Sequence, residues 1–381
     1  MDEALTHGKP LHGKAADAAA LQAAVTMMDA LYGSDSLYAE YAGRMGKEYF
    51  PNNPRYATTI IGPTTQQMAT IHYTIAALKQ KIAALGDGNA VQQGRAHGDR
   101  NAPWIAKLIT LADGRKDGSR AATLSTLTPY MTEDTGNPGG YVAPTGRPAM
   151  TETWGTVTPL GMPAATLRKL EAKVPPAPTA TNVDSQEHHK DMLRTECVGT
   201  IDELPEDAKR DCLLAGFTPA TPEQNKSALF WNDPGMTIHP PAHLLSILNT
   251  LARANNYSVQ KTAHFSALLG KGLHNAAVAA WNLKYKYNAW RPQTAIRNVW
   301  SGNAQDTKWL SLIAMPPHPD YPAGHPTFSG AAAVILSYMV GQDTPSFTSE
   351  SEAYCNYGAP TRNRLGRTTA CTKDGKTYSI T

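Results

Sequence analysis

We predict an all-α fold, a helix bundle whose helices are joined by long Pro- and Gly-rich loops. Apolar residues recur at helical spacing along the 381-residue chain, whereas neither a strand ladder nor an alternation of strands and helices is visible. The 28 prolines and 30 glycines mark the connections. Apolar residues continue through these connections, which indicates ordered loops and not disorder.

Three helices are expected in the N-terminal part of the chain. An alanine-rich stretch at 15–32 has helical spacing, and further helices are expected at about 64–85 and about 100–113. From about 126 to 178 the chain is rich in Pro, Gly and Thr, so we expect a long ordered loop there. Burial of the Trp154 indole would anchor this loop.

Four helices are expected in the C-terminal part. They cover 222–230, 241–255, 258–290 and about 326–340; Pro292 ends the third, and Pro326 fits the first position of the fourth.

These elements suggest three regions, which we expect to form one continuous domain. They are an N-terminal helical region (1–125), a loop-rich connection (126–220) and an anion-binding helical core (221–381).

The composition is that of a soluble globular protein, with 41% hydrophobic and 18% charged residues. The net charge of +3 argues against a nucleic-acid partner. An apolar run at 330–340 is too short to span a bilayer, and residues 1–14 carry no apolar signal-peptide core. We expect no membrane partner and, by default, a cytoplasmic location, or secretion if the N-terminus is incomplete. Assembly into a homo-oligomer is left open.

The four cysteines fall into two local pairs, Cys197 with Cys212 and Cys355 with Cys371. Their spacing is not that of a metal site, and we predict no metal ligand among them. Two disulfides would indicate an oxidising compartment, and free cysteines are the alternative.

A lysine and an arginine seven residues apart form the first chemical motif. Trp281, Lys284, Asn288 and Arg291 share one face if the helix continues to Pro292. Two cations this close repel each other unless an anion or a carboxylate lies between them. Arginine offers a planar fork to oxyanion oxygens and lysine a compact charge. A solvated face is the alternative, although the surrounding aromatic residues favour burial.

Gly324 and His325 form the second motif, directly before a helix. Backbone amides at a helix N-terminus bind anions, a glycine permits close approach, and a histidine can move protons near neutral pH. A helix-capping histidine is the alternative. We call Lys284, Arg291, Gly324 and His325 the cradle.

The two motifs resemble the signature of the vanadium-dependent haloperoxidase and type 2 phosphatidic acid phosphatase superfamily, Lys-x6-Arg-Pro followed by Pro-Ser-Gly-His. Residues 280–297 are similar to the soluble haloperoxidase branch, and weaker similarity extends through 94–99, 154–155 and 228–231. The resemblance therefore covers most of the chain.

The resemblance implies a role for each cradle residue. Lys284 and Arg291 would bind the equatorial oxygens of vanadate, or of phosphate as the alternative oxyanion. The backbone N–H of Gly324 would donate to the same anion, and His325 would act as acid–base. Trp281 would support the cradle beside the lysine.

His318 occupies the position where bromide-preferring members carry histidine, so bromide or iodide is the expected halide; an ordinary polar loop residue is the alternative. The implied activity is oxidation of halide by hydrogen peroxide at bound vanadate, with a small organic acceptor. A soluble acid phosphatase of the same superfamily and a non-catalytic oxyanion-binding protein are the alternatives.

The sequence departs from the family at two places. Ala323 replaces the serine of the second motif, and a lost hydroxyl donor costs about 1–3 kcal/mol. The third motif, Ser-Arg-x5-His, is absent, and no histidine follows His325, so the axial vanadate ligand of the family is not present. We expect the chain to be a fragment, short at both ends, with a degenerate homologue as the alternative.

Overall fold

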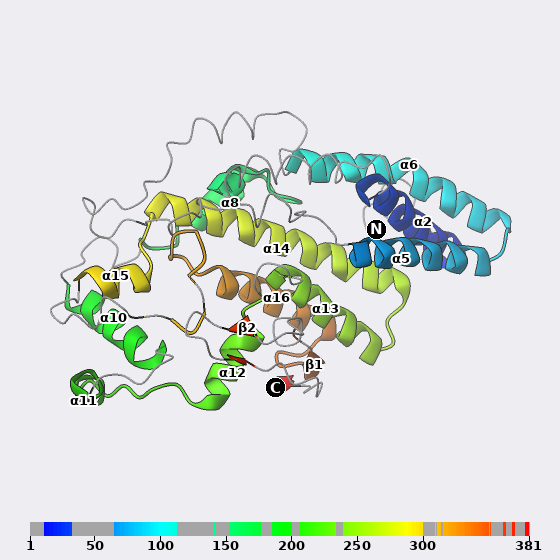
Figure 1. Cartoon of the computed structure of the whole chain (residues 1–381). Coiled ribbons are helices and arrows are strands. Elements are labelled where there is room, and N and C mark those ends of the chain that lie inside the picture. Colours follow the sequence, from blue (N-terminus) through cyan, green and yellow to red (C-terminus); the bar gives the residue numbers. More distant parts are fainter. Residues whose placement is uncertain are drawn as a thin grey trace. The chain divides into compact units, whose positions relative to one another are not determined.

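The computed structural model describes residues 11–32, 65–112, 141, 152–176, 185–199, 206–233, 239–299, 309, 311–313, 315–349, 351, 361–362, 368–369 and 378–380. The described chain is mainly helical, as predicted (Figure 1). It divides into two compact units: Met1–Ala122 with Ala252–Lys271, and Thr123–Leu251 with Gly272–Thr381.

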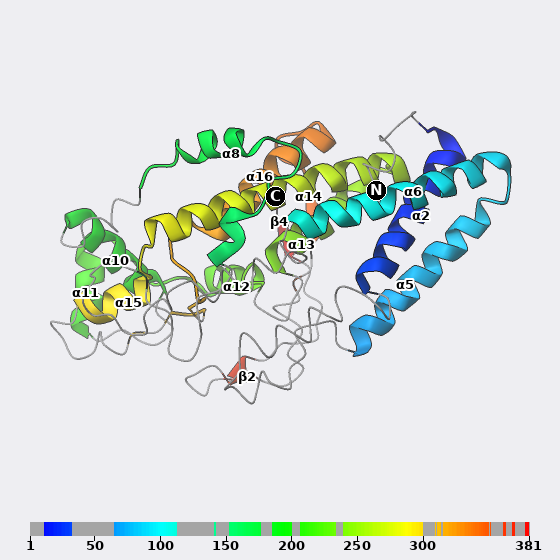
Figure 2. The same ribbon diagram turned by 90° about the horizontal axis from the view of Figure 1, so that it is seen from above.

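The first unit contains α2 (Gly13–Tyr32), α5 (Thr65–Ala84) and α6 (Asn89–Ala112). Helices α2 and α5 lie where the sequence predicts them. Helix α2 packs against both α5 and α6 (Figures 1 and 2). Its contact with α5 is apolar and is formed by Leu21, Val25, Met28, Ile75, Leu78 and Ile82.

Helix α6 begins at Asn89 and not at about residue 100, because two of its glycines serve a packing contact. A Cβ at Gly94 would collide with the carbonyl oxygen of Ala15, and one at Gly98 would come within 2.5 Å of that of Ala19. The glycines therefore let the backbones of α6 and α2 approach closely. Glycine has low helix propensity, which is why the sequence pattern did not predict the part of α6 before residue 100.

The second unit begins with short elements in the region that the sequence marks as loop-rich. They are η1 (Glu152–Thr156), α8 (Ala164–Glu171), α10 (Gln186–Gly199) and α11 (Glu206–Leu214). The segment predicted as one ordered loop at 126–178 therefore contains a helix, α8. A buried disulfide between Cys197 and Cys212 joins α10 to α11, so the structure decides in favour of a disulfide at this pair, which the sequence left open. Cys355 and Cys371 lie outside the described residues.

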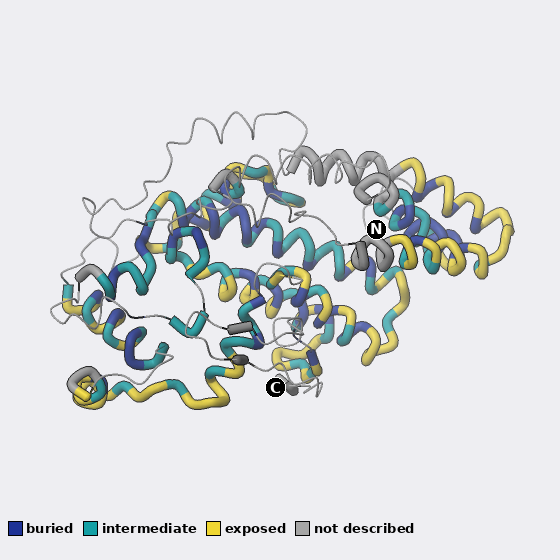
Figure 3. Tube along the Cα trace, viewed as in Figure 1, coloured by how far each residue is buried: buried dark blue, intermediate teal, exposed yellow. Residues whose placement is uncertain are grey.

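Helix α12 (Pro222–Phe230) has the predicted bounds, since Thr221 and Gln224 form a capping box at its start. It is followed by α13 (His239–Ala254) and α14 (Val259–Tyr287). From Gly272 onward α14 carries buried residues at helical spacing (Figure 3).

Helix α14 ends at Tyr287 and not at Trp290, and Arg291 is therefore not on it. Asn288 has a left-handed backbone with φ of 48°, which terminates the helix. Pro292 then begins α15 (Pro292–Val299), a helix that the sequence did not predict. The expectation that Lys284 and Arg291 share a helix face was wrong.

Helix α16 (Gly324–Val340) starts two residues before the predicted Pro326, which lies in its first turn, where proline is tolerated. Two small antiparallel strand pairs follow, which the sequence did not predict. Strand β1 (Phe347–Ser349) pairs with β4 (Tyr378–Ile380), and β2 (Thr361–Arg362) with β3 (Thr368–Thr369). Among the helices in the described ranges, none has both the length and the apolarity needed to cross a bilayer.

Candidate functional site

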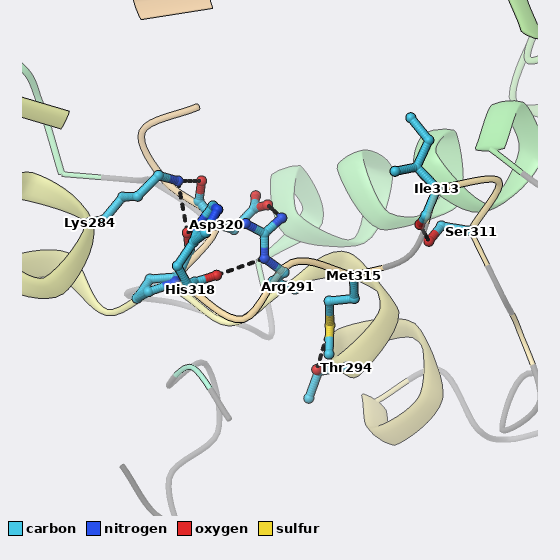
Figure 4. Close-up of polar contacts among 9 residues, drawn as sticks. Lys284, Arg291, Thr294, Ser311, Ile313, Met315, His318 and Asp320 are labelled. Carbon is cyan, nitrogen blue, oxygen red and sulfur yellow. Dashed lines mark hydrogen bonds and ion pairs between the residues drawn. The ribbon is translucent and has the colours of Figure 1, made fainter. Parts of the chain in front are cut away.

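Lys284 lies in the last turn of α14, and its side chain is buried, with 1% exposure. Its Nζ donates to the carbonyl oxygens of Pro319 at 2.8 Å and Asp320 at 2.7 Å (Figure 4). The pKa of Lys284 is lowered from 10.5 to about 7, first by burial and then by the charge of Arg291, while the charge of Asp320 acts in the opposite direction. An anion next to the ammonium group would favour its charged form.

Arg291 binds the same short segment, residues 318–320, from the connection between α14 and α15 (Figure 4). Its Nε donates to the carbonyl oxygen of His318 at 2.7 Å, and its Nη2 donates to His318 Nδ1 at 2.8 Å. Its Nη1 pairs with Asp320 Oδ1 at 3.3 Å. Burial lowers the pKa of Arg291, but a guanidinium stays protonated in proteins. The two predicted cations are thus brought together by a shared segment.

His318 is a neutral acceptor in this arrangement. Arginine can only donate, so Nδ1 accepts and the ring proton is assigned to Nε2. Burial, followed by the charges of Arg291 and Lys284, lowers the pKa of His318 to about 3. The imidazole therefore orients Arg291 and carries no charge near neutral pH.

The indole of Trp281 lies between the cations and the start of α16. Its centroid is 5.9 Å from Lys284 Nζ and 5.3 Å from the ring of His318. A Cβ on Gly324 would lie 3.5 Å from the same indole, so α16 begins in contact with it. Trp154, from η1, packs on Trp281 at 4.9 Å between centroids. The sequence had placed Trp154 only as an anchor of its loop.

His325 is exposed, and its Nε2 lies 3.3 Å from the carbonyl oxygen of Asn232. It is close enough that its charge contributes to the lowered pKa of His318. Ala323 is the N-cap residue of α16 and provides no side-chain cap to its first amides. Among the predicted site residues, Lys284, Arg291 and His318 are in direct contact around one segment. Gly324 and His325 lie at its margin, at the start of α16.

A network on the other side of Trp154 holds this region in place. The buried carboxylate of Glu171, on α8, accepts from Asn282 Nδ2 at 2.6 Å and is paired with Arg168. Arg168 also donates to the carbonyl oxygen of Gly155 at 2.7 Å. These bonds fix η1 and α8 against the helix that carries Trp281 and Lys284.

Asp320 is the residue that sequence reasoning missed. The repulsion between two neighbouring cations required an anion or a carboxylate, and Asp320 supplies one, two residues after His318. Its side chain is 43% exposed, whereas that of Arg291 is 13% exposed. This carboxylate balances the charge of Arg291, so positive charge is in excess whenever Lys284 is protonated.

This donor set fits an oxyanion such as vanadate or phosphate. Lys284 donates two of its three ammonium protons to carbonyls, and Arg291 has five N–H groups in a planar fork, some of which already contact His318 and Asp320. In the part of the chain that the structure describes, no three His, Cys, Asp or Glu side chains are grouped to hold a metal ion. The residues therefore suit the oxygens of the anion, while the axial histidine of the family is absent from residues 326–381.

Comparison with known proteins gives results in agreement with these features. The family model described as the VCPO second helical-bundle domain matches residues 264–367, which contain the cradle. The vanadium chloroperoxidase of Curvularia inaequalis is 28% identical over 150 residues, covering 33% of this chain. The match spans 24% of the length of that relative.

A solved structure supports the same fold. One described as the first bacterial vanadium-dependent iodoperoxidase aligns with a TM-score of 0.53 and 20% identity, over 91% of this chain and 79% of that one. A bacterial vanadium-dependent chloroperoxidase in its holo form aligns with a TM-score of 0.48 and 14% identity, over 100% and 86%. The family model and the curated relative agree with the two motifs, so the resemblance to the vanadium-dependent haloperoxidase superfamily is confirmed, and the iodoperoxidase structure supports the fold.

Proposed function

We propose that the protein binds a vanadate-type oxyanion beside Lys284 and Arg291 and catalyses the oxidation of halide by hydrogen peroxide. The observation that carries this proposal is the convergence of buried Lys284 and partly buried Arg291 on one segment that offers a single carboxylate. A burial of this kind is costly unless an anion compensates the charge. The named relatives, a chloroperoxidase and an iodoperoxidase, support the same chemistry.

The proposal gives each residue around the anion a separate role. Lys284 and Arg291 hold the oxygens of the anion, and the Gly324 amide donates from the start of α16. His318, neutral, orients the guanidinium through its Nδ1. His325, which is exposed, holds or moves a proton at its Nε2. When bound, vanadate supplies a Lewis acid that activates peroxide.

Bromide or iodide is the halide that we propose, on the basis of the histidine at position 318. Phosphate and vanadate present similar oxygens to cationic donors, so the cradle fits a phosphatase as well. Assays of both reactions are therefore needed.

The binding step is tested by isothermal titration calorimetry with vanadate and with inorganic phosphate. We expect Lys284→Met to weaken binding at least about tenfold, because a buried charge contact to the anion is lost. Lys286→Met, which removes an exposed lysine two residues away, is the matched control and is expected to bind like the parent chain. Equal affinities of all three proteins would contradict the proposed site.

The reaction is tested with vanadate, peroxide and bromide by bromination of monochlorodimedone, beside hydrolysis of p-nitrophenyl phosphate. Bromination that is lost in Lys284→Met supports the haloperoxidase. Phosphate ester hydrolysis without bromination would support the phosphatase. Oxyanion binding without either reaction would indicate a protein that only binds the anion.

A further inference from the structure

The donors of the two cations are already engaged by residues 318–320. Lys284 Nζ donates to two carbonyl oxygens, and Arg291 donates to a carbonyl oxygen and an imidazole nitrogen (Figure 4). The remaining charged partner is the carboxylate of Asp320. An incoming oxyanion must therefore compete with residues 318–320 for the donors of Lys284 and Arg291.

The partners in this segment differ in how readily they can leave. The carbonyl oxygens belong to a fixed backbone, because Pro319 is fully buried and the N–H of Asp320 donates to the Ala289 carbonyl oxygen at 3.0 Å. The Asp320 carboxylate is different. Its side chain is 43% exposed, and it contacts Arg291 Nη1 at 3.3 Å, longer than the 2.7 Å bond from Arg291 Nε to the His318 carbonyl oxygen. Rotation into water would release Arg291 without moving the backbone.

The surrounding charges make this carboxylate the natural competitor of a ligand. Lys284 and Arg291 attract the carboxylate, and the neutral His318 neither attracts nor repels it. Another nearby basic residue is His325, at the start of α16. A bound oxyanion would need the same face of the Arg291 fork and would repel a carboxylate that stayed close by.

We propose that Asp320 is an internal counter-ion of the cradle, which an oxyanion displaces from Arg291, and that it thereby sets the affinity of the site. The proposal rests on the proposed oxyanion-binding function. Lys284 keeps its two carbonyl contacts throughout, so the position of the ammonium group does not change when the carboxylate leaves. Removal of the carboxylate charge should therefore strengthen anion binding, which is the opposite of what loss of a ligand-binding residue does.

The test compares Asp320→Asn with the parent chain by isothermal titration calorimetry, with inorganic phosphate and with vanadate as separate probes. We expect the affinity for either anion to rise about fivefold, because the anion no longer has to displace a partly exposed ion pair, and such a pair contributes little to stability. Asp343→Asn is the matched control. It neutralises an exposed carboxylate beyond the C-terminal end of α16, a helix whose 17 residues span about 25 Å.

Circular dichroism and thermal melting verify that the variants fold, and Asp320→Ser is a second neutral variant with the same expected gain. Equal affinity of Asp320→Asn and the parent chain would overturn the inference and leave the proposed function intact. An equal gain in Asp343→Asn would also overturn it, since the effect would then be one of overall charge. Binding by none of these proteins would overturn the proposed function and the inference together.

Discussion

Two groups of buried polar side chains in the second unit differ in how their charges are balanced. One is Lys284 and Arg291 with residues 318–320. The other, the buried triad, consists of Asp233, His243 and Ser349. His243 Nδ1 lies 2.9 Å from Asp233 Oδ2, and its Nε2 lies 2.9 Å from Ser349 Oγ. The triad links the end of α12, helix α13 and strand β1.

The distances in the triad are those of an acid–histidine–serine arrangement in nucleophilic enzymes. Its surroundings argue for a structural role. All three side chains are buried, and the rings of Trp231 and Phe230 pack on His243 at 5.0 and 5.4 Å between centroids. Both ring nitrogens of the histidine have partners within the triad, so the group is complete without a ligand.

The site around Lys284 is neither balanced nor closed. Two cations face one carboxylate, and that carboxylate is partly exposed. The difference teaches that good hydrogen-bond geometry does not by itself mark a binding site. Excess charge together with an exposed edge favours a bound anion, and an anion that binds the folded chain stabilises it.

The largest expected effect is on the triad. Replacement His243→Ala leaves the carboxylate of Asp233 and the hydroxyl of Ser349 buried without their partner, so we expect the free energy of unfolding to fall by about 3 kcal/mol. Urea unfolding measures this loss. The control His72→Ala removes an exposed histidine of α5 and should change stability by less than about 0.5 kcal/mol. If the folded His243→Ala variant bound phosphate more weakly than the parent chain, the triad would contribute to anion binding. Its purely structural role would then be contradicted.

The next effect is the pH dependence of stability that Lys284 introduces. The pKa of Lys284 is about 7 in the folded chain and 10.5 for an ordinary lysine. Between these values the unfolded chain binds a proton that the folded chain does not, so stability rises with pH, by up to about 1.4 kcal/mol per pH unit. We expect the free energy of unfolding of the parent chain to rise relative to that of Lys284→Met between pH 7.5 and about 9.5.

Urea unfolding at several pH values measures this difference. Lys286→Met should retain the slope of the parent chain, because that lysine is exposed. Identical slopes in the parent chain and Lys284→Met would show that the pKa of Lys284 is not lowered in the folded chain. The contrast between the unbalanced charges of the site and the complete triad would then disappear.

The smallest effect concerns reactivity. Because the triad is enclosed, we expect Ser349 to remain unmodified after incubation with a fluorophosphonate probe, as measured by mass spectrometry of the peptide that contains it. A serine hydrolase treated in parallel shows that the probe is active. A Ser349 adduct that depends on His243 would mean that the triad opens and acts as a nucleophile, and its structural assignment would have to be abandoned.

The sequence predicted the parts of the site that depend on short-range patterns. Helical spacing placed Trp281 and Lys284 on one helix, and the Gly-His motif placed the start of α16 within two residues. The proximity of Lys284 and Arg291 was also predicted, but for the wrong reason. Asn288 ends α14, and the shared contacts with residues 318–320 bring the arginine back.

What the sequence did not predict depends on contacts between distant segments. The role of Asp320 follows from the docking of residues 318–320 onto α14, and no local pattern reports that. The start of α6 depends on Gly94 packing against α2, which overrides the poor helix propensity of glycine. In the same way, α10 gains stability from its disulfide to α11.

The acceptors that hold Lys284 belong to the main chain and not to side chains. Substitutions at 319 and 320 that preserve the path of the backbone therefore leave both carbonyl oxygens in place. The position of the ammonium group therefore does not depend on which side chains residues 319 and 320 carry, whereas the charge at position 320 can change. Evolution or protein engineering can thus adjust how strongly the site attracts an anion without rebuilding the geometry that receives it.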